Sequence, residues 1–168
     1  LAEKGVTDIY MVAYTNPRPY NTATGQTLAE AIQGYWAKVG VNCRIDTFDW
    51  TSYIDKCNTG DFDVCLFGWT GDNGDPDNFL NLLANEDIGI NVAHYKNDEY
   101  NAMLAEAVSL PNGDERNALY GEMEQKLADE CVWLPISHQE SLSAYVSNVH
   151  NFIFHPTGNV YLSKTYKY

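Results

Sequence analysis

Basic residues are scarce in this chain of 168 residues, which has 10 Lys and Arg against 23 Asp and Glu and therefore a formal net charge of −13 at pH 7. A field of this sign repels the phosphate backbone of nucleic acids and anionic lipid surfaces. Long apolar runs are missing too, because no stretch approaches the roughly 20 residues that a membrane-spanning helix needs. We therefore expect neither a nucleic-acid partner nor a transmembrane helix.

Cysteine is rare, and its spacing argues against a metal centre. The four cysteines stand at positions 43, 57, 65 and 131 without a CxxC pair, and the four histidines form no HxxxH or HExxH motif, so a structural zinc site is not expected. Disulfide frameworks are typical of smaller secreted domains, so we predict buried, unpaired thiols. Cys43 and Cys65 lie in apolar runs, where a free cysteine behaves as a small hydrophobic residue.

Common catalytic motifs are absent, because the sequence contains no GxSxG, Walker A or GxGxxG pattern. Three carboxylates in one turn-rich segment, Asp72, Asp75 and Asp77, leave a calcium site or an acid–base pair open as alternatives. The EF-hand pattern fails, since counting from Asp72 places Leu83 at the twelfth position, where a glutamate belongs. We predict that the chain is not an enzyme and needs no cofactor.

The composition that remains, 45% apolar and 20% charged residues, is that of an ordinary globular protein. Short β-rich runs over 8–14, 41–47 and 63–69 alternate with helical patterns over 28–39 and 50–58. This order predicts an α/β fold with a largely parallel sheet flanked by helices. The run over 63–69 is almost wholly apolar, which favours a strand buried on both faces.

The second half of the chain predicts helices followed by irregular structure. The expected elements are helices over 98–109 and 113–130 and short strands over 90–96, 132–138 and 142–146. Thr27 with Glu30 predicts a capping box for the first helix of the chain, and Asn112 with Glu115 predicts a cap for the last. Aromatic residues without a period after position 148 predict an extended tail that packs on another surface.

Two opposite charges follow two of the predicted strands. Arg18 lies in a proline-bracketed loop after the strand over 8–14, and Asp72 lies in the loop after the strand over 63–69. In an open parallel sheet, ligands bind beyond the carboxyl ends of the strands. An anion receptor and a cation receptor would then lie at one edge of the sheet. The alternative is a surface arginine in a turn and a turn-stabilising aspartate.

The segment Gly68-Trp-Thr-Gly-Asp-Asn-Gly-Asp-Pro-Asp-Asn-Phe79 closely resembles a segment of periplasmic dipeptide-binding proteins, the extracytoplasmic solute-binding components of ABC importers for peptides and nickel. Arg18-Pro-Tyr-Asn21 resembles the arginine loop of that family, and Tyr35-Trp-Ala-Lys-Val-Gly-Val41 its helix-to-strand turn. Leu119-Tyr120 and Leu134-Pro-Ile136 are similar to its late helix and the strand that follows. The similarity covers essentially the whole chain.

The resemblance implies capture of dipeptides or short oligopeptides for ABC import. Asp72 would hold the α-ammonium group of the ligand and Arg18 its carboxylate, while the strand end offers backbone to the peptide. The implied ligand-binding residues are Asp72, Arg18, Gly68, Trp69, Thr70 and Tyr20. The implied partners are a small peptide and a membrane permease, and the implied location is the periplasm or cell surface, with a lipid anchor as one option. Nickel, haem and glutathione remain alternative ligands.

The resemblance also implies that the chain is the C-terminal portion of a two-lobed receptor. Residues 1–138 would form most of the second, ligand-binding lobe, and residues 139–168 would form a tail that returns to the first lobe. The opening run, Leu1-Ala-Glu-Lys-Gly5, is typical of the last turn of a helix that enters from an upstream segment.

Overall fold

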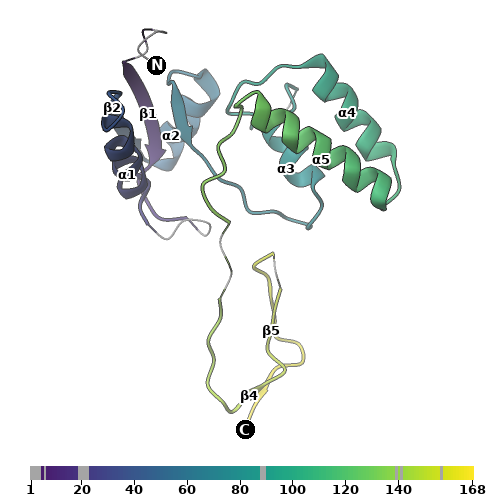
Figure 1. Cartoon of the computed structure of the whole chain (residues 1–168). Coiled ribbons are helices and arrows are strands. Elements are labelled where there is room, and N and C mark those ends of the chain that lie inside the picture. Colours follow the sequence, from purple (N-terminus) through teal and green to yellow (C-terminus); the bar gives the residue numbers. More distant parts are fainter. Residues whose placement is uncertain are drawn as a thin grey trace.

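The computed structural model describes residue 5 and residues 7–18, 23–87, 90–138, 140, 142–155 and 157–168. The elements are β1 Asp8–Tyr14, α1 Gly25–Ala37, β2 Asn42–Phe48, α2 Trp50–Thr59, β3 Val64–Leu66, α3 Asp77–Ala84, α4 Asp98–Ser109, α5 Asp114–Asp129, β4 Val149–His150, β5 Ile153–Phe154, β6 Val160–Tyr161 and β7 Tyr166–Lys167. Figure 1 shows the sheet with α1 and α2, the helices α3, α4 and α5 beside it, and an extended tail. The helix end predicted for residues 1–4 and the site residue Tyr20 lie outside the described residues.

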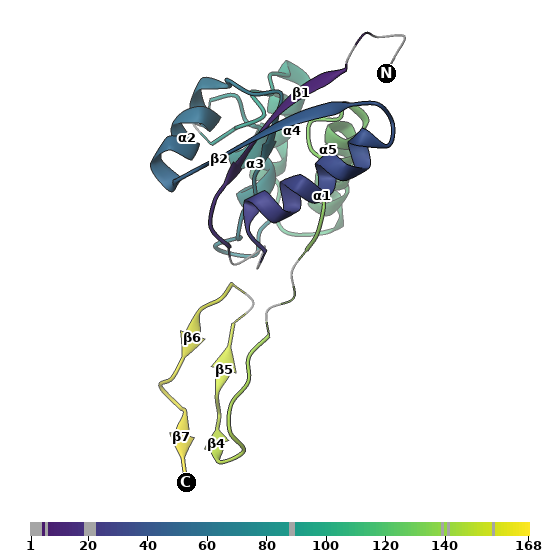
Figure 2. The ribbon, with the colours of Figure 1, turned by 90° about the vertical axis from the view of Figure 1, so that its left-hand side faces the viewer.

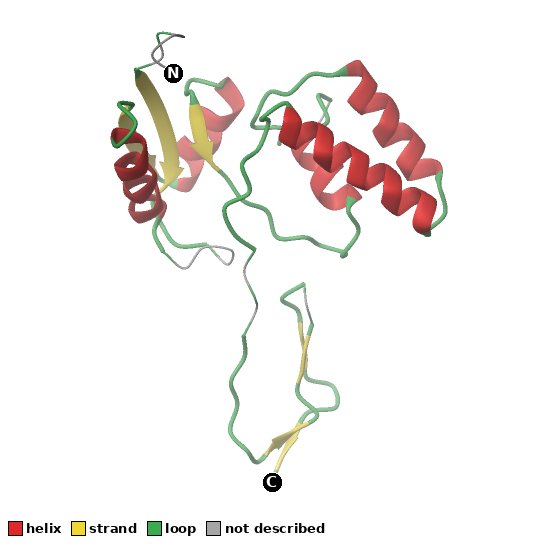
Figure 3. Ribbon diagram, in the orientation of Figure 1, coloured by secondary structure: helices red, strands yellow, loops and turns green. Residues whose placement is uncertain are grey.

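The sheet has the strand order β2-β1-β3, and both pairings are parallel. This confirms the predicted α/β fold with a parallel sheet flanked by helices (Figure 3). The central strand is β1, whose Met11, Val12 and Ala13 are fully buried. The prediction that the third strand is buried on both faces was wrong. Val64–Leu66 are half-buried because, among the described residues, β3 pairs only with β1.

The two helices of this unit lie on opposite sides of the sheet (Figures 1 and 2). On one side, Tyr53 and Cys57 of α2 pack against Val12, and all three side chains are buried. On the other side, α1 begins where the chain passes close to the end of β1. A Cβ atom at Gly25 would lie 2.1 Å from the carbonyl oxygen of Tyr14, so only glycine fits this approach.

The predicted capping box at the start of α1 was placed one turn too late. The N-cap is Thr24, whose Oγ1 accepts the backbone N–H of Thr27 at 3.1 Å, and Glu30 accepts a hydrogen bond from the side chain of Gln26. A threonine at either position fits the capping pattern, and the tight approach of Gly25 to β1 decides which one is used.

Helices α3, α4 and α5 form a second hydrophobic core beside the sheet. The helix predicted over 98–109 is confirmed by α4, and the one predicted over 113–130 is confirmed by α5. The predicted cap of α5 was wrong, because Gly113 is the N-cap without a side-chain bond. The buried residues of this core are Leu80, Ala84, Tyr100, Leu104, Ala107, Tyr120, Met123 and Leu127. No helix in the described part of the chain is long and apolar enough to cross a membrane.

Three segments predicted as strands are irregular in the structure. Residues 90–96 form turns in which the side chain of Asn91 bonds both the backbone N–H and the carbonyl oxygen of Tyr95. Residues 132–138 and the described residues 142–146 have no strand pairing. Their β-branched and aromatic residues favour strands, but a strand forms only where a neighbouring strand supplies hydrogen bonds.

The four cysteines are free thiols in the structure. The expected burial holds only for Cys57, because Cys43 and Cys65 are half-buried and Cys131 is exposed.

The tail after α5 extends away from both cores (Figure 2). It contains two short antiparallel pairings, β4 with β7 and β5 with β6. Ring contacts within the tail join Tyr145 to Phe152 at 5.1 Å and His150 to Tyr166 at 5.2 Å, measured between centroids. Its exposed large apolar residues are Leu142, Tyr145, Val146, Ile153, Val160, Tyr161, Leu162, Tyr166 and Tyr168.

Candidate ligand-binding site

The candidate site lies beyond the carboxyl ends of β1 and β3. These strands are parallel neighbours, with Met11 opposite Val64 and Ala13 opposite Leu66, so the segments that follow them leave the sheet from the same edge. Arg18 is in the segment after β1, and Gly68 and Asp72 are in the segment after β3. The topology therefore places the two charged residues predicted from the sequence beyond the same end of the sheet.

Arg18 is half-buried and lies over two aromatic rings. Its guanidinium carbon is 4.5 Å from the ring centroid of Trp50 and 5.8 Å from that of Tyr14. The two rings meet edge to face, with centroids 5.2 Å apart. A guanidinium within about 6 Å of an aromatic face is attracted to it. Neither aromatic residue was predicted as a partner of Arg18, because no local motif marks these ring contacts.

Asn78, in the first turn of α3, organises the segment that carries Asp72. Its Oδ1 accepts hydrogen bonds from the indole Nε1 of Trp69 at 3.0 Å and from the backbone N–H of Asp72 at 2.9 Å. Its Nδ2 donates to Oδ2 of Asp72 at 3.2 Å. One carboxamide thus fixes both the tryptophan ring and the aspartate, while the carboxylate of Asp72 remains on the exposed surface.

The predicted backbone donors and acceptors are close to this loop. Gly68 and Trp69 are half-buried, and Thr70 is exposed. The turn itself packs on α3, because a Cβ atom at Gly71 would lie 2.7 Å from the ring of Phe79. A larger residue at position 71 would push the loop away from the helix that holds it.

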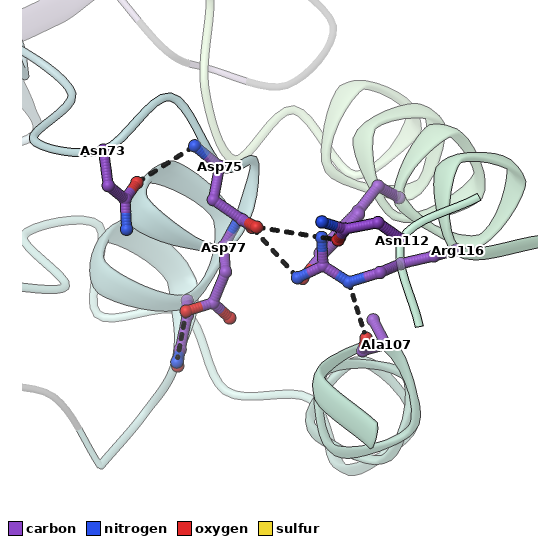
Figure 4. Close-up of polar contacts among 8 residues, drawn as sticks. Asn73, Asp75, Asp77, Ala107, Asn112 and Arg116 are labelled. Carbon is purple, nitrogen blue, oxygen red and sulfur yellow. Dashed lines mark hydrogen bonds and ion pairs between the residues drawn. The ribbon is translucent and has the colours of Figure 1, made fainter. Parts of the chain in front are cut away.

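A second anchor joins the same loop to α5. The Arg116 guanidinium binds both carboxylate oxygens of Asp75, with distances of 2.9 Å from NH1 to Oδ2 and 3.0 Å from NH2 to Oδ1 (Figure 4). Oδ1 also accepts the backbone N–H of Asp77 at 2.9 Å. The hydrogen bonds from Arg116 hold the pKa of the Asp75 carboxyl below its ordinary value.

The remaining donors of Arg116 bind its own helix pair. Nε donates to the carbonyl oxygen of Ala107 at 3.0 Å, NH1 donates to Oδ1 of Asn112 at 3.2 Å, and NH2 donates to the hydroxyl of Tyr120 at 2.9 Å. Arg116 is buried, with 9% of its surface exposed. A planar fork with every bond satisfied holds the loop rigidly against the second core. This pair was not predicted from the sequence, because 41 residues separate Asp75 from Arg116 and no local pattern marks it.

Comparison with known proteins shows the family to which the chain belongs. The model of the bacterial extracellular solute-binding proteins, family 5 Middle, matches residues 1–90, which is more than half of the chain. The chain belongs to family 5 of the bacterial extracellular solute-binding proteins.

Relatives in family 5 bind different solutes. Heme-binding protein A of Haemophilus influenzae is 35% identical over 150 residues, which are 88% of this chain and 26% of that protein. The dipeptide-binding protein of Pseudomonas aeruginosa is 36% identical over 152 residues, which are 89% of this chain and 28% of that protein. The chain therefore spans little more than a quarter of the length of these relatives.

The fold agrees with that of a solved family 5 receptor. The dipeptide-binding protein of a Pseudoalteromonas species, determined in complex with Met-Leu, matches with a TM-score of 0.81 and 27% identity. The match covers 96% of this chain and 32% of that one. These family 5 relatives are periplasmic solute-binding proteins and not enzymes.

The three carboxylates of the loop have separate structural partners. Asp72 is bound by Asn78, Asp75 by Arg116, and Asp77 by Asn81 at 3.4 Å. In the described part of the chain, no group of three or more His, Cys, Asp or Glu side chains is arranged to hold a metal ion. In this family 5 chain the aspartates build the loop, and two of them connect it to α3 and α5.

Proposed function

We propose that the protein containing this chain is the substrate-binding component of an ABC importer and captures dipeptides or short oligopeptides through their charged termini. The observation that carries the proposal is the placement of Arg18 and Asp72 after neighbouring parallel strands, at one edge of the sheet. A peptide zwitterion carries one charge of each sign, and each would meet its opposite at this edge.

Asp72 is suited to receive the α-ammonium group. Asn78 accepts a hydrogen bond from the backbone N–H of Asp72 and donates one to its carboxylate, so little conformational freedom is lost when a ligand binds. Charge-assisted hydrogen bonds are roughly twice as strong as neutral ones, and they gain further when a closing receptor excludes water.

Arg18 is suited to receive the carboxylate. A planar guanidinium binds both carboxylate oxygens at once, and the rings of Trp50 and Tyr14 restrict its position. Between the two charges, Gly68, Trp69 and Thr70 would offer backbone groups to an extended peptide. The open side of β3 supports this arrangement, because among the described residues only β1 pairs with that strand.

The other wall of the binding cleft is proposed to come from a first lobe elsewhere in the protein, since the chain spans only 28% of its dipeptide-binding relative. We propose that residues 1–138 belong to the ligand-binding lobe, that residues 139–168 pack on the first lobe, and that the permease of the importer is the membrane partner. We also propose an extracytoplasmic location, which the periplasmic location of the relatives supports.

Haem is the competing ligand, because a haem-binding relative is about as similar to this chain as the dipeptide-binding one. Calorimetric titration of the full-length protein separates the two. Met-Leu should bind, and both N-acetyl-Met-Leu and Met-Leu amide should bind much more weakly. Haem binding with no response to any dipeptide would contradict the proposal, and so would equal binding of the three peptide forms.

A further inference from the structure

Cys57 and Cys65 lie side by side, with their sulfur atoms 3.4 Å apart. Cys57 is in the last turns of α2, and Cys65 is the middle residue of β3. We propose that these two thiols close into an intrachain disulfide when the protein meets a disulfide oxidant, so that the cross-link ties α2 to the strand that leads into the ligand-binding loop. The proposal is independent of which solute the protein binds.

The surroundings already hold the two sulfur atoms toward each other. Tyr53 lies one turn before Cys57 on α2. Its hydroxyl oxygen is 3.1 Å from the sulfur of Cys65 and donates a hydrogen bond to the carbonyl oxygen of Leu66 at 2.7 Å. This bond fixes α2 against β3 at the position of the thiols. A disulfide bond is about 2.05 Å long, so the sulfur atoms must approach by about 1.4 Å, which small rotations of the two side chains supply.

The chemistry favours one order of events. Cys65 is half-buried and Cys57 is buried, so an oxidant reaches Cys65 first. The Cys65 thiolate attacks the oxidant disulfide, forms a mixed disulfide and releases one oxidant thiol. The Cys57 thiolate then attacks the Cys65 sulfur, forms the Cys57–Cys65 bond and expels the second oxidant thiol. The protein loses two protons and two electrons, which the oxidant disulfide takes up as two thiols.

The pKa values of the two thiols are shifted in opposite directions. The hydrogen bond from the Cys65 thiol lowers the pKa of the Cys57 thiol and outweighs the opposing effect of burial, so the resolving thiolate is available. The neighbouring Cys57 and burial raise the pKa of Cys65, so the first exchange is the slow step and should become faster as the pH rises.

The periplasmic location of the relatives and the short ring that the disulfide would close both support the cross-link. Disulfides persist in the periplasm, which is where the family 5 relatives are found. The bond would close a ring of residues 57–65 and restrict the unfolded chain, which should raise the Tm of the full-length protein by roughly 2–5 °C.

Peptide mapping of the full-length protein tests the proposal. The protein is reduced, exposed to oxidised glutathione, alkylated with N-ethylmaleimide under denaturing conditions and digested with trypsin. Lys56 and Lys96 bracket both cysteines, so one tryptic peptide, 57–96, contains them together. After oxidation this peptide should carry no alkyl group and be about 2 Da lighter than its dithiol form.

Cys43 and Cys131 are internal controls, because trypsin places them in the separate peptides 39–44 and 127–164. The Cys43→Ser/Cys131→Ser variant should oxidise and gain thermal stability as the parent does. Cys57→Ser and Cys65→Ser should each abolish both effects. A peptide 57–96 that keeps two alkyl groups or two glutathione adducts, or that is joined to either control peptide, would overturn the proposal.

Discussion

Asp72 and Arg18 are held by different physical means, although they act on one ligand in the proposed function. A neutral carboxamide orients Asp72, and two aromatic rings restrict Arg18. Asp75 is held by a third means, because its carboxylate forms an ion pair with Arg116.

Replacing Asp72 with Asn should lower dipeptide affinity in the full-length protein by roughly 2–5 kcal/mol, because the ligand ammonium would lose its opposite charge in a closed cleft. Calorimetry should also find that N-acetylation of the peptide weakens binding to the parent far more than to the variant. Asp98→Asn, an equivalent change at an exposed residue of α4, is the matched control and should leave affinity unchanged. Equal effects of N-acetylation on parent and variant would assign the ammonium to another residue.

Replacing Arg18 with Lys should weaken dipeptide binding by about tenfold or more, because an ammonium group cannot reproduce the bidentate fork. Peptide amides lack the carboxylate and should bind parent and variant with the same affinity. Tight binding of amides to the parent would place the ligand carboxylate beyond Arg18 and indicate longer peptides.

Most of the helices and strands were predictable from the sequence, but the order of the strands in the sheet was not. A short β-rich run over 8–14 predicted β1, hydrophobic alternation over 41–47 predicted β2, and helical spacing predicted α4 and α5. Helix α3 was missed, because its first residues, Asp77 and Asn78, are also typical of turns. The central position of β1 was not predictable either, since strand order is set by packing between distant segments and not by local pattern.

The same division holds within the site. Arg18 and Asp72 were found from their place after predicted strands and from a specific resemblance. Asn78, Trp50 and Arg116 were missed, because their importance lies in contacts across 6, 32 and 41 residues of sequence, respectively. No local period or motif records such contacts.

The pairing of the loop with α5 should contribute to stability. Asp75→Asn should lower the free energy of unfolding by about 2 kcal/mol, because the buried guanidinium of Arg116 would lose its charged partner. Glu99→Gln also removes a carboxylate charge, here from an exposed ion pair with Lys126 between α4 and α5. It should lower the free energy of unfolding by less than about 1 kcal/mol. Urea unfolding of the two variants measures both values, and equal losses would contradict the assignment.

The contribution of Asp75 should depend on pH in a defined direction. Its folded-state pKa lies below the ordinary value of about 3.9, so the folded state binds the proton less tightly than the unfolded state does. The stabilisation is then complete above about pH 5 and is lost as the pH falls through the folded-state pKa. In urea unfolding, the difference between the parent and Asp75→Asn should be constant from pH 7 to pH 5 and shrink at pH 3. A difference that grows at pH 3 would contradict this sign.

Across the whole molecule, the apolar surface is distributed unevenly. The sheet and the helices α3 to α5 have buried cores, whereas the large apolar residues of the tail are mostly exposed. Exposed apolar groups of this extent are typical of a surface that contacts another part of a protein. This agrees with the proposal that residues 139–168 pack on a first lobe.

The isolated 168-residue chain should therefore have a tail that exchanges its amide hydrogens fast. Hydrogen exchange should be complete within minutes over residues 142–168 and slow in β1 and α5, because the tail has few buried contacts. Removing residues 142–168 should change the Tm by no more than about 2 °C relative to the 168-residue chain, and it should reduce any self-association. Strong protection of the tail in a monomer would mean that it packs on its own chain.

A crystal structure of the full-length protein with bound Met-Leu tests the central claim most directly. The account predicts the peptide nitrogen terminus at about 2.7–2.9 Å from a carboxylate oxygen of Asp72 and the peptide carboxylate bound by both terminal nitrogens of Arg18. The peptide backbone should run beside Gly68 to Thr70. A peptide bound in the opposite direction, or bound away from the sheet edge where β1 and β3 end, would contradict it.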